Sequence, residues 1–406
     1  MGALDGIRVV DLSRVLAGPL CTQTLADHGA DVVKVEPPMG DETRLFGPPF
    51  DAAGDAAYFA SVNRGKRALS LDLSKPEGRA VLAKLLDTAD VLVENFLPGT
   101  MEKWGIGYET LATRHPRLVY CAISGFGTDG PLGGLPGYDA VLQAMCGLMS
   151  VNGSETSGTM RLGVPIVDHL TGYVATSGIL MALYARERTG KGQRVEAVLF
   201  DTGLSLLVPH AANWFASDRA PRLLGSAHPN ICPYDKFKAG DGEIFLGVAN
   251  DNQFRKLCER LGRLDLGDDP RFLTNASRLA HRDALKAELE ATFALHEVDA
   301  LCRDLMRIGV PAGPVNTVPQ ALTQAHAAHR GMVVSEGDYR GVGTPVKLSQ
   351  SSANPTRRPP RFGEHADEIM AAAGCDDDEI ARLRKTGVLH DRPSRPHTPS
   401  IRRKTG

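Results

Sequence analysis

The first 36 residues limit the fold most strongly, because two apolar strand-like segments flank a helix-like one. Residues 7–12 form a short apolar run, residues 20–28 read as a helix that follows a proline, and residues 30–36, ADVVKVE, form a second apolar run. Gly29 suits the end of that helix. Two strands joined by such a helix pair in parallel through a right-handed crossover. The opening of the chain therefore predicts an α/β fold with a parallel sheet.

The same alternation continues through the first half of the chain. Residues 76–86 predict a helix that starts at a proline, and residues 91–95 and 117–124 predict strands. A long amphipathic helix over 172–188 is followed by a turn and strand over 190–199. Repeated alternation of strands and helices is typical of a doubly wound, Rossmann-like sheet.

The pattern changes near residue 220, which predicts a second, smaller domain. We assign residues 1–220 to the N-terminal part of a large α/β domain and residues 225–325 to a smaller α+β domain. Residues 330–391 should return to the large domain, with a strand over 343–350. Residues 392–406 are basic and rich in proline and serine, which is typical of a disordered tail.

Composition excludes several classes of protein. The seven cysteines are scattered without CxxC spacing, and the twelve histidines include no HExxH, so neither a disulfide framework nor a metal site is expected. A net charge of −2 gives no general attraction to nucleic acid. Short apolar runs and the lack of a signal-peptide pattern predict a cytoplasmic protein without membrane association.

Two motifs invite a functional interpretation. The sequence GFGTDG, residues 125–130, matches a dinucleotide-binding pattern, but prolines and glycines follow where a helix should open, so it predicts a loop. The strand VLVE ends at Asn95, and ligands of open α/β sheets bind beyond the carboxyl ends of strands. Asn95 could bind a ligand or hold the turn through its own backbone.

Asp168 ends an apolar run and precedes the long helix, in the sequence VPIVDHLTG. It could be the helix N-cap, a role worth about 1 kcal/mol in which aspartate is common. Alternatively, the helix N-terminus could keep its carboxylate ionised as a nucleophile. Taken alone, the cap is the commoner role. His169 could neighbour the site or only start the helix.

Several further motifs occur together and in order. They are LDGIRVVDLSRVLAGPLCTQTLADHGADVVKVEPPMGDETR, NRGKRALSLDLSKPEG, VENFLPGTMEKWGIGY, SGFGTDGPLGGLPGYDAV, VPIVDHLTG, RTGKGQRVEAVLFDT, GVPAGPVN and RPPRFGEHADEI. With these motifs the chain resembles family III CoA-transferases, the group of formyl-CoA:oxalate and carnitine CoA-transferases. The resemblance covers about residues 4–390.

The resemblance implies a fold, an activity and a set of site residues. Two chains, each with a large Rossmann-like domain and a small one, would form an interlocked homodimer. Asp168 would be the nucleophile that carries CoA through an aspartyl anhydride and an aspartyl-CoA thioester. CoA would be a substrate rather than a bound cofactor, and its contacts would include Val15, Ala17, Leu71, Asn95, Phe96, Lys103 and Tyr138.

The substrates are predicted from departures within the family pattern. Leu16 replaces a glutamine of the formyl/oxalate enzymes, and the segments TRLFGPPF and HAANWF are closer to the branch that acts on dicarboxylates such as succinate, glutarate, itaconate, mesaconate or hydroxymethylglutarate. Arg14, Arg44 and Arg64 are candidates for a distal carboxylate.

Three alternatives to transfer between molecules remain at this point. The first is an α-methylacyl-CoA racemase, although Tyr138 stands where those enzymes carry a histidine. The second is an isomerase that moves CoA within one dicarboxylate, and the third is a non-catalytic CoA-binding protein.

Overall fold

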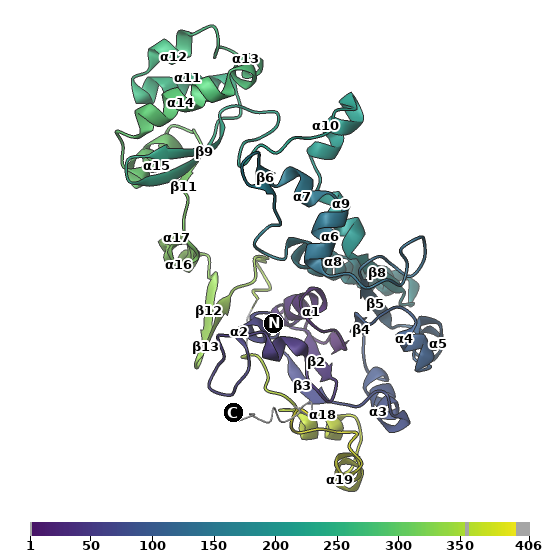
Figure 1. Cartoon of the computed structure of the whole chain (residues 1–406). Coiled ribbons are helices and arrows are strands. Elements are labelled where there is room, and N and C mark those ends of the chain that lie inside the picture. Colours follow the sequence, from purple (N-terminus) through teal and green to yellow (C-terminus); the bar gives the residue numbers. More distant parts are fainter. Residues whose placement is uncertain (1, 354–356, 395–406) are drawn as a thin grey trace, which may run out of the picture. The chain divides into compact units, whose positions relative to one another are not determined.

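The computed structural model describes residues 2–353 and 357–394, which group into two compact units (Figure 1). Of the described residues, those within 1–146, 163–206 and 328–406 form the large unit, and those within 147–162 and 207–327 form the small unit. Most of the tail predicted from residue 392 lies outside the described residues.

The large unit is built on a six-stranded parallel sheet, which confirms the predicted α/β fold with a parallel sheet. Its strands are β1 (Arg8–Asp11), β2 (Asp31–Glu36), β3 (Arg67–Ser70), β4 (Val91–Glu94), β5 (Val119–Ser124) and β8 (Arg194–Val198). They lie in the order β3-β2-β1-β4-β5-β8, with neighbours parallel. Taken in sequence order, these six strands have the Rossmann arrangement 3-2-1-4-5-6.

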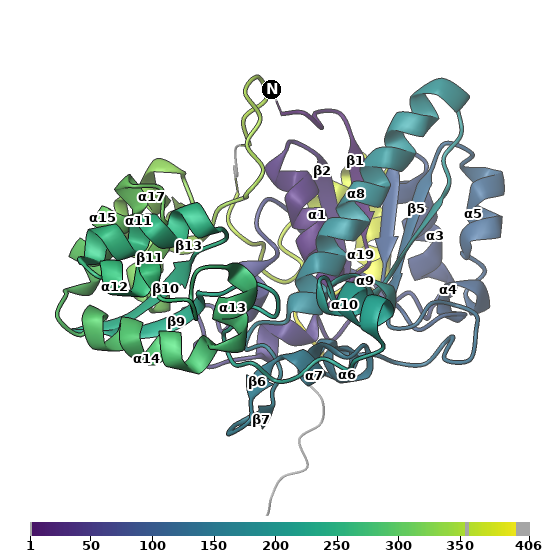
Figure 2. The ribbon, with the colours of Figure 1, turned by 90° about the horizontal axis from the view of Figure 1, so that it is seen from above.

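Helices cover both faces of this sheet, so its central strands are apolar on both sides. Helices α1 (Ala17–Asp27) and α8 (Ile166–Thr189) lie on one face, and α3 (Pro76–Leu86) and α18 (Ala366–Ala372) lie on the other (Figures 1 and 2). In β1 this places Val10 in the core beneath α3 and α18. Gly29 follows α1 with a φ of 107°, as predicted for the end of that helix.

Shorter elements complete the large unit. They are the 3-10 helix η1 (Glu42–Leu45), α2 (Ala57–Ser61), α4 (Thr100–Lys103), α5 (Tyr108–Arg114), α6 (Asp139–Met145), α9 (Leu199–Ser205), the hairpin β12 (Val333–Glu336) and β13 (Tyr339–Val342), and α19 (Asp377–Lys385).

The small unit has its own core and an antiparallel sheet. Its strands β9 (Tyr234–Ala239), β10 (Gly242–Gly247) and β11 (Ala312–Pro314) lie in the order β11-β10-β9. The other elements are α7 (Leu148–Val151), β6 (Gly153–Ser154), β7 (Gly158–Thr159), α10 (His210–Ser217), α11 (Asp251–Leu261), α12 (Leu264–Asp268), α13 (Asn275–Ala280), α14 (Arg282–Phe293), α15 (Val298–Arg307) and α16 (Val318–Thr323), with α17 (Ala325–His329) at the junction. Buried side chains of α11, α14 and α15 pack against β9 and β10.

Two local predictions differ from the structure. No strand forms over 343–350, because the hairpin of β12 and β13 ends before it. Helix α8 begins at Ile166, six residues before the predicted start, because its first turn is capped from another helix (below). By length and composition α8 could cross a membrane, and 44% of its most apolar window is buried inside the protein.

Candidate active site

The candidate site is a cavity at the carboxyl-terminal edge of the parallel sheet. The strand order reverses between β1 and β4, and open α/β sheets bind ligands beyond their carboxyl ends at such a point. The segments that follow β1, β4 and β5 line a cavity of about 280 Å³ there, together with Asp168 from the first turn of α8. The fold thus gathers segments that are distant in sequence.

Seven of the eleven residues predicted for the site line this cavity. They are Arg14, Val15, Ala17, Asn95, Phe96, Tyr138 and Asp168. The structure therefore places the predicted nucleophile beside most of the predicted CoA contacts.

Leu71 and Lys103 lie outside the lining of this cavity. Leu71 is fully buried after β3, and its backbone N–H donates to the carbonyl oxygen of Glu36. Lys103 is exposed at the end of α4. Their contact with CoA stays a prediction.

The guanidinium groups of Arg44 and Arg64 are already occupied by protein partners. Arg44 donates through Nε and Nη2 to Glu36 and through Nη1 to Asp55, at 2.7–2.8 Å. Arg64 donates through Nε and Nη2 to both carboxylate oxygens of Asp27. Both arginines are buried, so each is bound as part of the fold, and Arg14 is the only one of the three that lines the cavity.

Asp168 does not cap α8. It is the third residue of the helix, whose N-cap position is occupied by Pro165. Oδ2 of Asp139, the first residue of α6, accepts the N–H groups of Val167 and Asp168 at 2.8 and 3.2 Å. Oδ1 of Asp139 accepts the side-chain amide of Gln143 at 2.6 Å. A carboxylate from another helix thus replaces the local cap and leaves the Asp168 side chain available to the cavity.

The charge state of Asp168 differs from the expectation. Burial raises its pKa to about 7, and the nearby carboxylate of Asp139 contributes to the rise. The helix N-terminus therefore does not keep this carboxylate strongly acidic, because desolvation and like charge outweigh the helix dipole. A more basic carboxylate is the stronger nucleophile once ionised, which suits attack on an acyl carbon.

Tyr58, on α2, lies close to these two acids. Burial raises its pKa to about 12, and the carboxylates of Asp168 and Asp139 add to that effect. Its ring packs near Leu16 of the cavity wall. The hydroxyl therefore stays protonated at neutral pH and can donate a hydrogen bond.

Asn95 lines the cavity, and its side chain bonds to a neighbouring loop rather than to its own turn. Its Oδ1 accepts the backbone N–H of Arg14 at 2.9 Å, and its Nδ2 donates to the Arg14 carbonyl at 2.7 Å. This pair of hydrogen bonds joins the loops after β1 and β4. It helps to hold Val15 at a φ of 69°, which a β-branched residue rarely adopts and which costs about 1–3 kcal/mol.

Buried charges support the same loop from below. Lys34 Nζ donates to the Ser13 carbonyl at 2.8 Å and pairs with Asp41 at 3.0 Å. Lys66 pairs with Asp11, also at 3.0 Å, and all four charged side chains are fully buried. Burial alone would raise the pKa of Asp11, but the ammonium groups of Lys66 and Lys34 hold it at about 2. The loop over residues 13–17 is therefore held by a hydrogen bond from a lysine that belongs to a network of buried ion pairs.

Sequence reasoning missed Asp139, Tyr58 and Glu42, which also lines the cavity. The only signal for Asp139 was its place after Tyr138 in GYDAV, and for Glu42 its place in GDETR. Nothing local marked Tyr58. His169, left open above, contacts the Pro165 carbonyl through Nδ1 at 3.1 Å and so lies against the start of α8.

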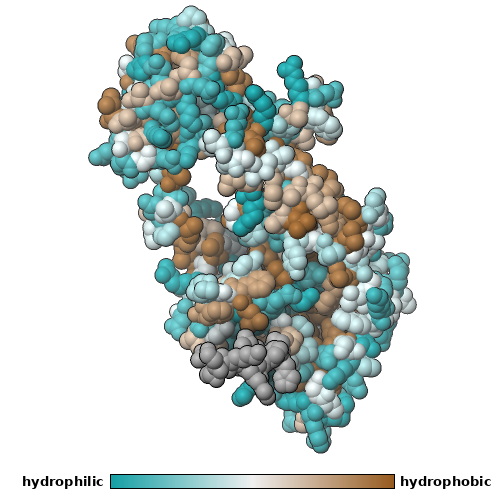
Figure 3. All heavy atoms as spheres, viewed as in Figure 1, coloured by the Kyte–Doolittle hydropathy of each residue, from teal (hydrophilic) through white to brown (hydrophobic). Residues whose placement is uncertain are grey.

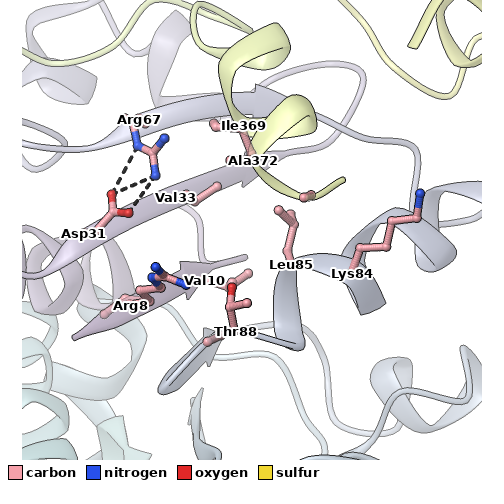
Figure 4. Close-up of a pocket in the computed structure, with 13 residues that line it drawn as sticks. Arg8, Val10, Asp31, Val33, Arg67, Lys84, Leu85, Thr88, Ile369 and Ala372 are labelled. Atoms are coloured by element: carbon pink, nitrogen blue, oxygen red, sulfur yellow. Dashed lines mark hydrogen bonds and ion pairs between the residues drawn. The ribbon is translucent and has the colours of Figure 1, made fainter. Parts of the chain in front are cut away.

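A second cavity, of about 150 Å³, lies at the opposite, amino-terminal edge of the sheet (Figure 4). Arg8, Asp31 and Arg67 at its rim are the first residues of β1, β2 and β3. Arg67 is paired with Asp31 and Glu368. No residue predicted for the site lines this cavity.

A Rossmann-like sheet with a buried, helix-borne carboxylate beside a cavity at its switch point is the arrangement of an α/β enzyme site. Comparison with known proteins makes this specific. The model of CoA-transferase family III matches residues 4–366. The chain belongs to this family.

Relatives and solved structures match nearly the full length. The chain is 41% identical to a succinate–glutarate CoA-transferase of Agrobacterium fabrum, over 91% of this chain and 95% of the relative. It is 40% identical to a succinyl-CoA:mesaconate CoA-transferase of Haloarcula marismortui, over 93% and 98%. A CAIB/BAIF family protein from Brucella suis is 42% identical and superposes with a TM-score of 0.83, over 92% and 99%.

Proposed function

We propose that this enzyme moves CoA from succinyl-CoA, or another dicarboxyl-CoA, to a free dicarboxylic acid of the glutarate or mesaconate type. The observation that carries the proposal is the position of Asp168, whose side chain lines the cavity where the predicted CoA-binding loops meet. The two named relatives, which act on glutarate and mesaconate by their names, support the substrate class.

The reaction we propose begins at the carboxylate of Asp168. One oxygen attacks the thioester carbonyl, and the C–S bond breaks. CoA leaves as a thiolate, and a mixed anhydride between Asp168 and the acyl group remains. The thiolate attacks the Asp168 carbonyl carbon, which releases the first acid as a carboxylate and leaves an aspartyl-CoA thioester. The acceptor carboxylate repeats these steps in reverse, and the thiolate finally takes the new acyl group. No water or net proton is consumed, and Asp168 is regenerated.

The surrounding groups serve this exchange by position. Asp139 holds the first turn of α8, so that the Asp168 side chain keeps its place through both half-reactions. The clamp between Asn95 and Arg14 fixes the loop that carries Val15 and Ala17 against the acyl-CoA. The Tyr58 hydroxyl, whose pKa the charges of Asp168 and Asp139 help to raise, stays protonated and can donate a hydrogen bond.

We also propose that the chain acts as an interlocked homodimer, as the family resemblance implies. Apolar side chains are exposed on the large unit, and Figure 3 shows brown, hydrophobic residues among the hydrophilic ones on one face of the molecule. On α8 alone, Met181 and Tyr184 are 70% and 68% exposed. Such exposure marks interaction surfaces. Light scattering after gel filtration should give twice the chain mass, and a monomer would refute this assignment.

A panel of acids tests the proposed activity. Succinyl-CoA is offered with glutarate, mesaconate, itaconate, hydroxymethylglutarate or valerate, and the CoA esters formed are read by mass spectrometry. We expect new dicarboxyl-CoA esters from the wild type and none from Asp168→Asn. Exchange of the α-proton of a branched acyl-CoA, without any new ester, would instead indicate a racemase. Binding of CoA without either reaction would indicate a non-catalytic protein.

A further inference from the structure

Arg14 is the cationic side chain among the described residues that line the cavity with Asp168. Among the described residues its guanidinium makes one hydrogen bond, from Nη1 to Oε1 of Glu42 at 2.8 Å. Both side chains are partly open, at 35% and 38% exposure. Its Nε is buried without a hydrogen-bond partner in the described structure, and the group lies 5.9 Å from the Phe96 ring centroid.

The contrast with Arg44 and Arg64 shows how incomplete this pairing is. Arg44 makes four hydrogen bonds and stacks 3.6 Å from the Phe59 ring centroid, and Arg64 binds both oxygens of Asp27. A guanidinium is a fork that matches a carboxylate with two parallel hydrogen bonds. Arg14 has one guanidinium nitrogen on Glu42, and its Nη2 makes no hydrogen bond among the described residues.

The positions of Arg14 and Glu42 are fixed by contacts of their own backbone segments with the rest of the protein, and do not depend on the ion pair between them. Asn95 fixes the backbone of Arg14 through two hydrogen bonds. Glu42 is the first residue of η1, whose N-cap is Asp41, and Asp41 is in turn paired with the buried Lys34. The pair is therefore preorganised, yet a pair so exposed contributes little to stability and is easily separated.

We propose that Glu42 is an internal stand-in for the distal carboxylate of the substrate. When the cavity is empty, the carboxylate of Glu42 is paired with the guanidinium of Arg14. The second carboxylate of an entering dicarboxylate takes its place with two hydrogen bonds, and Glu42 turns to solvent. This inference rests on the proposed function and adds to it the residues that select the acid.

An acid with one carboxylate cannot make this exchange. A monocarboxylate of equal length reaches Asp168 but offers nothing to Arg14, so the Arg14–Glu42 pair stays closed. In a dicarboxylate the second carboxylate replaces an existing carboxylate, so the charge balance of the cavity is preserved. Glu42 thus lowers the affinity for dicarboxylates, while Arg14 makes their selection possible.

Steady-state kinetics with two acids of equal chain length separate these roles. In a ping-pong reaction kcat/KM for the acid is independent of the donor, so it is measured for glutarate and for valerate with succinyl-CoA as donor. Where valerate turns over too slowly, its inhibition constant against glutarate is used. The variants are Glu42→Gln, Arg14→Gln and Arg14→Lys, with Glu109→Gln, an exposed residue of α5, as the control.

We expect Glu42→Gln to raise kcat/KM for glutarate by about threefold to tenfold, because the competing charge is gone. Arg14→Gln should lower it by at least about tenfold and Arg14→Lys by less, because lysine keeps the charge without the fork. Valerate should change by less than about twofold in all three. The control should match the wild type with both acids.

The outcomes distinguish this inference from the function on which it rests. If the wild type moves CoA to no acid, the proposed function fails. If it does so but the Glu42→Gln variant loses activity with glutarate, Glu42 positions Arg14 and the exchange is refuted. Equal changes with glutarate and valerate would refute it as well, since the effect would then not concern the second carboxylate.

Discussion

Replacing Asp168 by asparagine should stabilise the fold while it abolishes transfer, and the gain should depend on pH. The folded protein raises the pKa of this carboxyl from an ordinary 3.8 to about 7. The unfolded chain therefore loses its proton first, and between about pH 4 and pH 7 rising pH costs the folded state up to about 4 kcal/mol. Asparagine has no charge to bury, so the variant escapes this cost.

The assay is urea unfolding at pH 5.5 and pH 8. The gain of Asp168→Asn over the wild type should be larger at pH 8 by about 2 kcal/mol, because more of the carboxyl must ionise there. Unfolding is followed by tryptophan fluorescence. Trp104 lies in the large unit and Trp214 in the small one, so in a Trp214→Phe background the fluorescence reports on the large unit alone. Asp129→Asn, at an exposed position, is the control and should show no such difference. A gain that is equal or smaller at pH 8 would refute the assigned burial of charge.

Three further changes test the geometry. Asp139→Asn should move the acidic limb of the pH–rate profile to lower pH, because the charge that helps to raise the pKa of Asp168 is removed; an unchanged limb would contradict this. Asn95→Ala should cost about 1–3 kcal/mol in urea unfolding and raise KM for acyl-CoA, because the Arg14 backbone loses two partners. Arg44→Ala should cost about 3–5 kcal/mol in the same assay, because it leaves a buried carboxylate unpaired, whereas Arg14→Gln should cost less than about 1 kcal/mol.

Local sequence patterns predicted the large unit well. The apolar runs that became β1 and β2 and the proline-initiated helix α3 carry their signals within a few residues, and residues 76–86 form a helix with the predicted bounds. Asn95 could be placed at a carboxyl end because it directly follows the apolar run of β4, whereas the switch point depends on the strand order, which only the fold gives. The strand predicted over 343–350 was wrong because a short apolar pattern cannot distinguish a strand from an extended loop.

The details of the site depend on contacts between distant residues. The cap of α8 comes from Asp139, 28 residues before the first N–H that it accepts. Arg64 resembles a free arginine in the sequence until the fold brings Asp27 against it. The pKa of Asp168 combines burial with that same Asp139, so neither the cap nor the charge state could be read from VPIVDHLTG alone.

The central claim is that Asp168 becomes covalently attached during transfer, and trapping tests it most directly. The protein is incubated with succinyl-CoA and hydroxylamine, digested, and its peptides are read by mass spectrometry, with Asp168→Asn as the matched control. An aspartyl intermediate predicts a hydroxamate at Asp168 in the wild type, and none in the control or without the acyl-CoA. Transfer of CoA to an acid with Asp168 unmodified, or undiminished transfer by the asparagine variant, would contradict the account.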